Sequence, residues 1–320
     1  MPLSSPAPDL VDRFRRDLSV LAGADACSIG VALSGGPDSL ALLLLAVAAF
    51  PERIAAATVD HGLRTDSAAE ASFAASVCAE LDVPHSTLQV TVPPGASVQA
   101  HAREARYAAL TGWAEEEALP VLVTGHHADD QAETLIMRLL RGSGVAGLAG
   151  VRARTPLGPS ISLCRPLLGW RRAELAAIVD AAGLEAVIDP SNVDERYDRV
   201  RVRRQLAETP WLDPLPIARS AAALAEADAA LDEVVRHLAA ERLSSGEGWA
   251  RLHPESIAPV LLRRLVARAL RHIVPLAAPR GEQIGALVEQ LERGGTATLA
   301  GVLCTGGDTW RFEPEPPRRT

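Results

Sequence analysis

A short stretch near the N-terminus, residues 28–50, constrains the fold more than any other part of the chain. Residues 29–33 are apolar and include β-branched side chains, which predicts a buried strand. Ser34-Gly35-Gly36-Pro37 then forms a turn, and the apolar run from Leu40 continues as a helix that Pro37 can begin. A strand, a glycine-rich loop and a helix N-terminus point unpaired backbone N–H groups at one place, which is a geometry that binds phosphate.

An ordinary strand-to-helix turn is the alternative interpretation, and two adjacent glycines would not decide against it. The polar residues favour a nucleotide site, because Ser34 and Ser39 can donate hydroxyls to a phosphate and Asp38 can hold Mg2+. The stretch carries the pattern S-G-G-x-D-S and resembles the PP-loop ATP pyrophosphatases, which cut ATP between its α and β phosphates. The resemblance implies that ATP contacts Ser34, Gly35, Gly36, Pro37, Asp38 and Ser39.

The chain contains no lysine, since all 32 of its basic residues are arginine. A Walker-type P-loop needs a lysine, and so do Schiff-base enzymes and nucleotidyltransferases that carry AMP on lysine. These classes are therefore excluded, whereas a loop that binds phosphate through backbone N–H groups needs no lysine. The cysteines are widely spaced and form no C-x-x-C pair, which gives no basis for a zinc, iron–sulfur or dithiol site: Cys27, Cys78, Cys164 and Cys304.

The net charge of −8 hides a local excess of positive charge. Between Arg138 and Arg204, twelve arginines stand against seven acidic residues. Such a segment can hold phosphates although the rest of the surface is acidic, or it can be a solvated helix face. The N-terminus shows no secretory signal, and no apolar run reaches the roughly 20 residues that span a bilayer. We therefore expect a cytoplasmic protein that does not contact membranes.

Strands alternate with helices through the first part of the chain, which predicts an α/β fold with a doubly wound, mostly parallel sheet. Strands are expected at residues 29–33, 54–61, 85–92, 121–125 and 161–167, with helices at 9–21, 40–50, 67–81, 97–118, 129–140, 171–182 and 197–206. Ligands of such sheets lie beyond the carboxyl ends of the strands. Three unusual clusters are expected at that edge: Ser34 to Ser39, Asp60 with His61, and Gly125 to Asp130.

Composition divides the chain into three parts. Residues 1–209 are expected to form the catalytic domain, and residues 210–216, with three prolines, a linker. Residues 217–320 are expected to form a smaller, mainly helical domain, with helices at 217–242, 254–272 and 280–292 and a final hairpin from residues 296–303 and 309–313. No motif with recognisable chemistry follows Arg204.

Gly125 to Thr134 carries a second group of chemical residues. Asp130 and Glu133 are three positions apart and therefore share a helix face. Asp129 and Asp130 could merely complement a helix N-terminus, or His127 and Asp130 could hold a divalent metal. We favour carboxylates that face a cationic substrate and transfer protons, because helix capping accounts neither for two histidines nor for a second carboxylate on the same face.

Seven blocks occur in the same order as in the tRNA(Ile)-lysidine synthetases, which the chain resembles over residues 25–206. Val200 stands where that family usually has asparagine within R-N-R-x-R. The blocks are Ser34 to Ser39, Val59 to Arg64, Arg103-x-x-Arg106-Tyr107, Gly125 to Thr134, Arg138 to Gly144, Arg165 to Leu168, and Asp189 to Asn192 with the arginine-rich helix that follows.

The resemblance implies a two-step reaction on tRNA(Ile) with the anticodon CAU. The C2 oxygen of the wobble cytidine (C34) attacks the α-phosphate of ATP, which gives adenylated cytidine and pyrophosphate. The ε-amine of free L-lysine then attacks C2, and AMP leaves. The product, lysidine, pairs with A rather than G, so that codon specificity changes from AUG to AUA and amino-acid identity from Met to Ile.

The resemblance also assigns residues to this chemistry. Asp38, Asp130 and Glu133 are the expected catalytic residues, with Mg2+ at Asp38. ATP is expected to contact the loop and also Asp60, His61, Gly125 and Arg141, and tRNA to contact Arg103, Arg106, Arg199, Arg201, Arg203 and residues 217–320. Because the lysine amine has a pKa near 10.4 and is almost fully protonated at pH 7, a carboxylate must bind the cation and a group must accept its proton. A homodimer is left open.

Three other functions are kept as alternatives. A PP-loop thiolase that delivers sulfur to a tRNA base usually needs paired cysteines. A PP-loop amidotransferase or synthetase that acts on a small molecule would not need the arginine-rich segment. A noncatalytic RNA-binding protein would have little reason to keep Ser34 to Ser39 together with Asp130.

Overall fold

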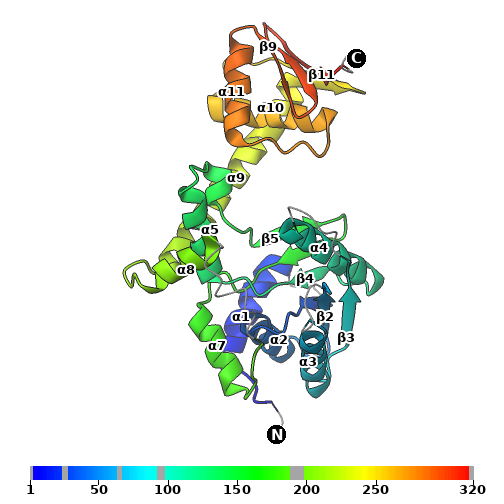
Figure 1. Cartoon of the computed structure of the whole chain (residues 1–320), viewed down its shortest axis with the longest axis vertical. Helices are drawn as coiled ribbons and strands as arrows, with labels where there is room; N and C mark the ends of the chain where they lie inside the picture. The colour runs from blue at the N-terminus through cyan, green and yellow to red at the C-terminus, as the bar shows by residue number, and fades with distance from the viewer. Residues whose placement is uncertain (1–2, 24–27, 63–66, 92–97, 188–197, 317–320) are drawn as a thin grey trace. The chain divides into compact units, whose positions relative to one another are not determined.

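The computed structural model describes residues 3–23, 28–62, 67–91, 98–187 and 198–316, without the side chains of residues 98–100. The chain divides into two compact units. Unit 1 consists of residues 1–141 and 149–222, and unit 2 of residues 142–148 and 223–320 (Figure 1). Among the described residues, no helix combines the length and the apolar character that a membrane crossing requires.

Unit 1 is built on a six-stranded sheet with the order β3-β2-β1-β4-β6-β5. Its strands are β1 (Ile29–Ala32), β2 (Ile54–Asp60), β3 (His85–Gln89), β4 (Val121–Val123), β5 (Arg154–Leu157) and β6 (Ile161–Cys164). Neighbours pair in parallel except at β5, which pairs antiparallel with β6 at the edge. The predicted doubly wound, mostly parallel α/β fold is confirmed.

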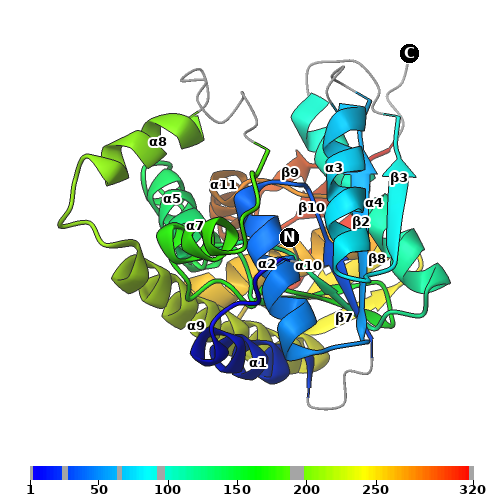
Figure 2. The ribbon, with the colours of Figure 1, turned by 90° about the horizontal axis from the view of Figure 1, so that it is seen from below.

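Helices cover both faces of this sheet. The helices are α1 (Pro8–Ala22), α2 (Pro37–Ala49), α3 (Ser67–Glu80), α4 (Val98–Glu116) and α7 (Arg172–Ala181). One core joins α1, α2, α3 and α7 to Ile29 and Val31 of β1, and α3 lies against β2 and β3 (Figure 2). A second core packs α4 on the opposite face, where the Trp113 ring lies so close to Gly30 that a Cβ there would be 2.9 Å from it. Gly30 is therefore the residue that lets α4 approach the sheet.

Two further helices of unit 1, α5 (Ala128–Leu139) and α8 (Asp198–Ala207), lie side by side (Figures 1 and 2). The long helix α9 (Pro214–Arg242) follows and continues into unit 2. Pro214 and Pro216 thus belong to a helix, and the prediction of a linker over residues 210–216 is wrong in its second half. Proline is tolerated in the first turn of a helix, because its missing N–H would have no intrahelical partner there.

Unit 2 contains a five-stranded antiparallel sheet in the order β7-β8-β11-β10-β9. Its strands are β7 (Leu243–Gly246), β8 (Trp249–Leu252), β9 (Thr296–Leu299), β10 (Val302–Thr305) and β11 (Trp310–Pro314). Helices α10 (Pro259–Ile273) and α11 (Gly281–Glu292) pack on it around Trp310 and Phe312, while α6 (Val145–Leu148) is a single turn. The predicted helices are present, but the sheet is larger than the predicted hairpin.

The predicted strand over residues 296–303 is in fact two strands, β9 and β10. They are joined at Ala300 and Gly301, which both have positive φ, 52° and 79°. Two consecutive residues with positive φ form the kind of turn that closes a tight hairpin, and alanine at one of them gives no sequence signal for it.

Candidate active site

The glycine-rich loop lies between β1 and α2 and is closed by its own hydroxyls. Ser39 Oγ donates a hydrogen bond to the carbonyl of Gly36 (2.9 Å) and accepts one from the Ser34 N–H (3.1 Å). The hydroxyls of Ser34 and Ser39 are also 3.1 Å apart, and Gly35 has the positive φ, 75°, that this turn requires. The loop is therefore shaped before any phosphate arrives.

Strand β4 ends against the same loop. A Cβ on Gly125 would lie 2.9 Å from the carbonyl oxygen of Asp38, so only glycine allows this approach without a shift of the backbone. His126 and His127 follow directly, and α5 begins at Ala128. Two clusters that are about 90 residues apart in the sequence thus meet at the carboxyl edge of the sheet.

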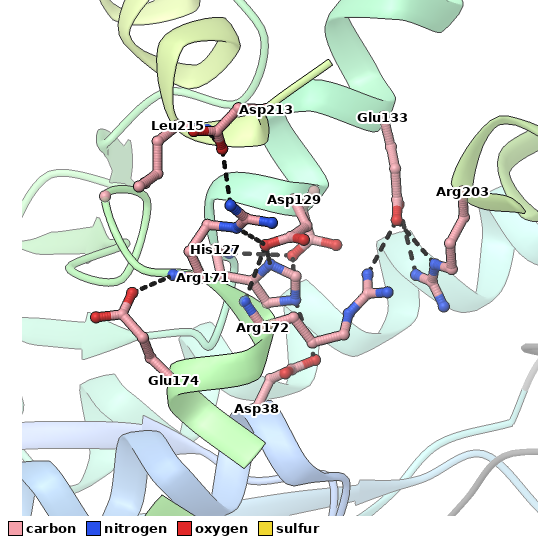
Figure 3. A network of polar contacts seen from close by, with 12 residues as sticks. Asp38, His127, Asp129, Glu133, Arg171, Arg172, Glu174, Arg203, Asp213 and Leu215 are labelled. Atoms are coloured by element: carbon pink, nitrogen blue, oxygen red, sulfur yellow. Dashed lines mark hydrogen bonds and ion pairs between the residues drawn. The ribbon is translucent and has the colours of Figure 1, made fainter. Parts of the chain in front are cut away.

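His127 is fully buried and lies among three carboxylates (Figure 3). Its ring nitrogens are 3.4 Å from Asp38, 3.6 Å from Asp129 and 3.6 Å from Asp130. Burial alone would lower the pKa of His127, but the three carboxylates outweigh burial and raise it to about 9. The imidazole is therefore a buried cation at neutral pH that holds the carboxylates of the loop and of α5 together.

Asp130 caps α5 and binds an arginine at the same time. Its Oδ2 accepts a hydrogen bond from the His127 N–H (3.1 Å), which satisfies one of the free donors at the helix N-terminus. Its Oδ1 accepts a hydrogen bond from Arg199 Nη2 (2.5 Å). Helix capping therefore accounts for one oxygen of Asp130, and the second oxygen faces α8.

Glu133 is 1% exposed and is surrounded by three guanidinium groups. It accepts hydrogen bonds from Arg199 (2.7 Å), Arg203 (2.8 Å) and Arg172 (2.9 Å), and Figure 3 shows Arg172 and Arg203 approaching this carboxylate from two elements. Burial raises the pKa of Glu133, but the pairing with Arg203 and Arg199 outweighs it and holds the pKa below its ordinary value. Glu133 is thus ionised, and its arginine partners carry more charge than it neutralises.

A second positive cluster lies around His126. The Nδ1 atom of His126 shares a hydrogen bond with the Thr124 hydroxyl, at a distance of 3.0 Å. Burial and the nearby arginines lower the pKa of His126 to about 3, so the ring is neutral at pH 7. Those arginines are Arg165, Arg103, Arg106 and Arg199. Arg103 and Arg106 from α4 and Arg199 from α8 are thereby brought to the same site, a concentration of positive charge suited to phosphate.

The remaining predicted residues lie at the edges of this arrangement. Hydrogen bonds with Ser67 and with the Gly62 N–H, which lies 2.9 Å from Asp60 Oδ1, lower the pKa of Asp60. Burial and Arg106 lower the pKa of His61. Arg141 binds Asp198 (2.8 Å) on the outside of α8, and Arg201 binds the same carboxylate (2.5 Å).

The donor set of the site fits Mg2+ at Asp38 better than a metal held by His127 and Asp130. Asp38 Oδ1 is buried without a hydrogen-bond partner among the described residues. Mg2+ is usually held by one or two carboxylates together with phosphate oxygens and water. No group of three or more His, Cys, Asp and Glu side chains in the described ranges is arranged as a metal site of its own.

Comparison with known proteins places this site in a family. Residues 11–209 match a family described as a PP-loop domain. The chain is 48% identical over 314 residues to the tRNA(Ile)-lysidine synthase of Novosphingobium aromaticivorans, covering 96% of this chain and 94% of that one. It is 43% identical to the tRNA(Ile)-lysidine synthase of Zymomonas mobilis, over 91% and 89% of the two chains.

The chain belongs to the tRNA(Ile)-lysidine synthase family. The predicted family and the predicted ATP-using ligase class are thereby confirmed. Among solved structures, a U34-tRNA thiolase from Methanococcus maripaludis shares the fold, with a TM-score of 0.55 and 19% identity over 68% of this chain and 79% of that one.

The cysteines give no support for thiolase chemistry in this family member. Cys78, Cys164 and Cys304 are free and buried in the parts of the chain that the structure describes, and Cys27 lies outside them. Burial raises the pKa of Cys78 and of Cys304 to about 12, so these thiols are not nucleophiles at neutral pH.

Several residues of the site are absent from the catalytic and binding residues predicted from the sequence: His126, His127, Asp129, Arg165 and Arg172. Of these, the sequence indicates His127 only as a metal ligand and Asp129 only as a helix cap. His127 and Asp129 stood inside a noted block, where the run of two histidines and two aspartates was the available signal. Arg172 carries no such signal, because its role follows only from the contact of the first residue of α7 with Asp129 and Glu133 of α5. Asp189 to Asn192, another block of the family, lies outside the described residues.

Proposed function

We propose that the chain ligates free L-lysine to C2 of the wobble cytidine in tRNA(Ile) with the anticodon CAU, with conversion of ATP to AMP and pyrophosphate. Nearly full-length similarity to tRNA(Ile)-lysidine synthases, together with the S-G-G-x-D-S loop beside Asp130 and Glu133, carries this proposal. Residues 1–209 would be the catalytic part, and residues 217–320 would contact the tRNA.

For the adenylation step, the loop of residues 34–39 would hold the pyrophosphate that leaves as the cytidine oxygen attacks the α-phosphate. Its backbone N–H groups, its two hydroxyls and the N-terminus of α2 are the available donors. The unpaired Oδ1 of Asp38 supports a role in holding Mg2+, and the chemistry that Mg2+ supplies when bound is neutralisation of the charge on the leaving group. Gly125 has no Cβ and thereby allows the chain after β4 to lie against this loop. Asp60, His61 and Arg141 would border the nucleotide.

For tRNA, the arginines around the site would bind backbone phosphates on either side of the reacting base. Arg199 and Arg203 have side chains that are 43% and 30% exposed, although the Glu133 carboxylate that they bind is buried. Each guanidinium therefore has a bound side and an exposed side. The exposed side could donate hydrogen bonds to phosphate oxygens, and Arg103, Arg106 and Arg201 would extend the same surface.

For lysine, the Arg199 guanidinium marks a place that accommodates a cation. It donates hydrogen bonds to both Asp130 Oδ1 and Glu133 Oε2, so the two carboxylates already bind one positively charged nitrogen group between them. We propose that the lysine ammonium takes this place once Arg199 turns to a tRNA phosphate. One of the carboxylates would then accept the proton before the amine attacks C2.

The decisive experiment is incorporation of radiolabelled lysine into unmodified tRNA(Ile) bearing CAU, with and without ATP and beside tRNA(Met). We expect ATP-dependent labelling of the isoleucine tRNA alone. Cleavage of ATP to AMP and pyrophosphate without labelling would refute the lysine assignment and favour another PP-loop reaction. We also propose that the protein acts in the cytoplasm, and sedimentation of the full chain would show whether it acts as a homodimer.

A further inference from the structure

A pocket of about 570 Å³ in unit 1 contains none of the residues proposed above as catalytic. It opens where α5 and α8 meet, and its volume falls in the range of roughly 300–1,000 Å³ that is usual for small-ligand sites. Its apolar wall comes from both helices and from the segment after α8: Ile136, Met137, Leu140, Val202, Leu206 and Trp211. Trp211 is 80% exposed at its rim, which is unusual for the largest apolar side chain.

The pocket lies next to the proposed active site along both helices. On α5, Ile136 and Met137 follow Glu133 by three and four positions and therefore share its helix face, about 5.4 Å further along the axis. On α8, Val202 follows Arg199 by three positions, and Leu206 follows Arg203 by three. A ligand that reaches one nucleotide beyond Glu133 along these helices thus meets the pocket.

The rim of the pocket carries more positive than negative charge. Among the residues that line the pocket, two arginines, Arg141 and Arg201, accompany one acid, Asp198, to which both donate hydrogen bonds. The side chains of the two arginines are 58% and 57% exposed. An apolar wall with an exposed tryptophan, bordered by half-exposed arginines, is the combination that binds single-stranded RNA, whose unstacked bases lie on aromatic rings while arginines bind the phosphates.

We propose that this pocket holds an unstacked nucleobase of the substrate tRNA, adjacent in sequence to the reacting cytidine, with its face on the Trp211 indole. The inference rests on the proposed function, because it takes the reacting cytidine to lie beside Glu133. A second copy of the chain is the competing occupant. RNA is favoured over it because the arginines of the rim attract phosphates, whereas two copies in a symmetric contact would bring these arginines near each other.

The test is a double-mutant cycle between Trp211 and the flanking base, read as the Kd of the full chain for a labelled RNA stem-loop with the CAU anticodon. One RNA is intact, and two others lack the base on the 5′ or the 3′ side of the wobble cytidine. We expect Trp211→Ala to weaken binding of the intact RNA about fivefold to a hundredfold, the range measured for stacking of one base on an aromatic ring. Removal of the correct base should weaken wild-type binding by a similar factor and leave Trp211→Ala unaffected.

Two matched variants separate stacking from simple apolar cover. Trp211→Phe should retain most of the affinity, whereas Trp211→Leu, which is apolar but has no aromatic face, should behave like Trp211→Ala. Equal affinities of wild type and Trp211→Ala for the intact RNA, or independent effects of the variant and of both abasic RNAs, would overturn the proposal. So would a change from dimer to monomer in Trp211→Ala without a change in RNA affinity. Lysine incorporation by the wild-type chain, measured separately, tests the proposed function independently of this cycle.

Discussion

Replacement of His127 by glutamine should remove a contribution to the stability of unit 1 that declines as the pH rises above 6. The imidazole is fully buried, and Asp38, Asp129 and Asp130 raise its pKa from 6.5 to about 9. A group whose pKa is raised by folding binds its proton more tightly in the folded state. Its contribution to stability is therefore complete below about pH 6.5 and is lost as the pH rises through about 9.

The size of this contribution follows from the shift in pKa. A rise from 6.5 to about 9 corresponds to about 3 kcal/mol of stabilisation. Between pH 6 and pH 8.5, about 2 kcal/mol of it should disappear. Asp129, whose pKa is lowered to about 2, is ionised throughout this window and adds no slope. His61, His85 and His126, whose pKa values are lowered in the folded chain, add a slope of the opposite sign, which wild type and variant share and which cancels in their difference. Glutamine keeps two N–H donors for the carboxylates but cannot carry the charge.

The assay is urea unfolding of the full chain at several pH values from 6 to 8.5 in the presence of a chelator. The free energy of unfolding of the wild type minus that of His127→Gln should be about 3 kcal/mol at pH 6 and should shrink by about 2 kcal/mol by pH 8.5. The matched control is His237→Gln, because His237 has an exposed side chain and an ion pair with Glu233 at 3.4 Å. This control should run parallel to the wild type. Parallel curves for wild type and His127→Gln, or an NMR titration of His127 near pH 6.5, would refute the reasoning.

Four other perturbations test separate parts of the site. Asp38→Asn should lower tRNA-dependent pyrophosphate release by at least about 100-fold at a temperature where the variant is folded, since it removes the carboxylate charge. Retained release would contradict the Mg2+ assignment. Glu133→Gln should lower lysine incorporation about 100-fold more than pyrophosphate release, and an equal loss of both steps would contradict its role toward lysine. Gly125→Ala should destabilise the chain by about 1–3 kcal/mol in thermal unfolding, because its Cβ would lie 2.9 Å from the Asp38 carbonyl oxygen. The control is Gly112→Ala in α4, which has open space around it and should stabilise the chain by about 0.5–1 kcal/mol. Similar effects of the two variants would argue against the close approach. Arg203→Ala should raise the KM for tRNA and reduce the slope of log affinity against log salt by about 0.7, and an unchanged slope would remove the phosphate contact.

The parallel strands could be predicted because their signals are local. Most of them are short apolar runs, β3 has an alternating pattern, and each precedes a helix of its own, so the succession of strands and helices along the chain is enough to recognise them. Strands β5, β7 and β8 lack such a signal. Pro156 in β5 is typical of an edge strand, and β8 is held in place through the pairing of Arg251 with Arg311, about 60 residues away. Their structure depends on partners that a local pattern does not reveal.

The sequence alone determined the chemical inventory of this protein: the loop from Ser34 to Ser39, the carboxylates of α5, the arginines of α8 and the family to which they belong. Only the tertiary structure decided which of these groups are partners. It placed Arg199 and Arg203 on Glu133, buried a charged His127 among three carboxylates, and opened the pocket beside Trp211. The physical reason is that a motif records which donors and acceptors are present, whereas their pairing depends on distances between helices that are far apart in the chain.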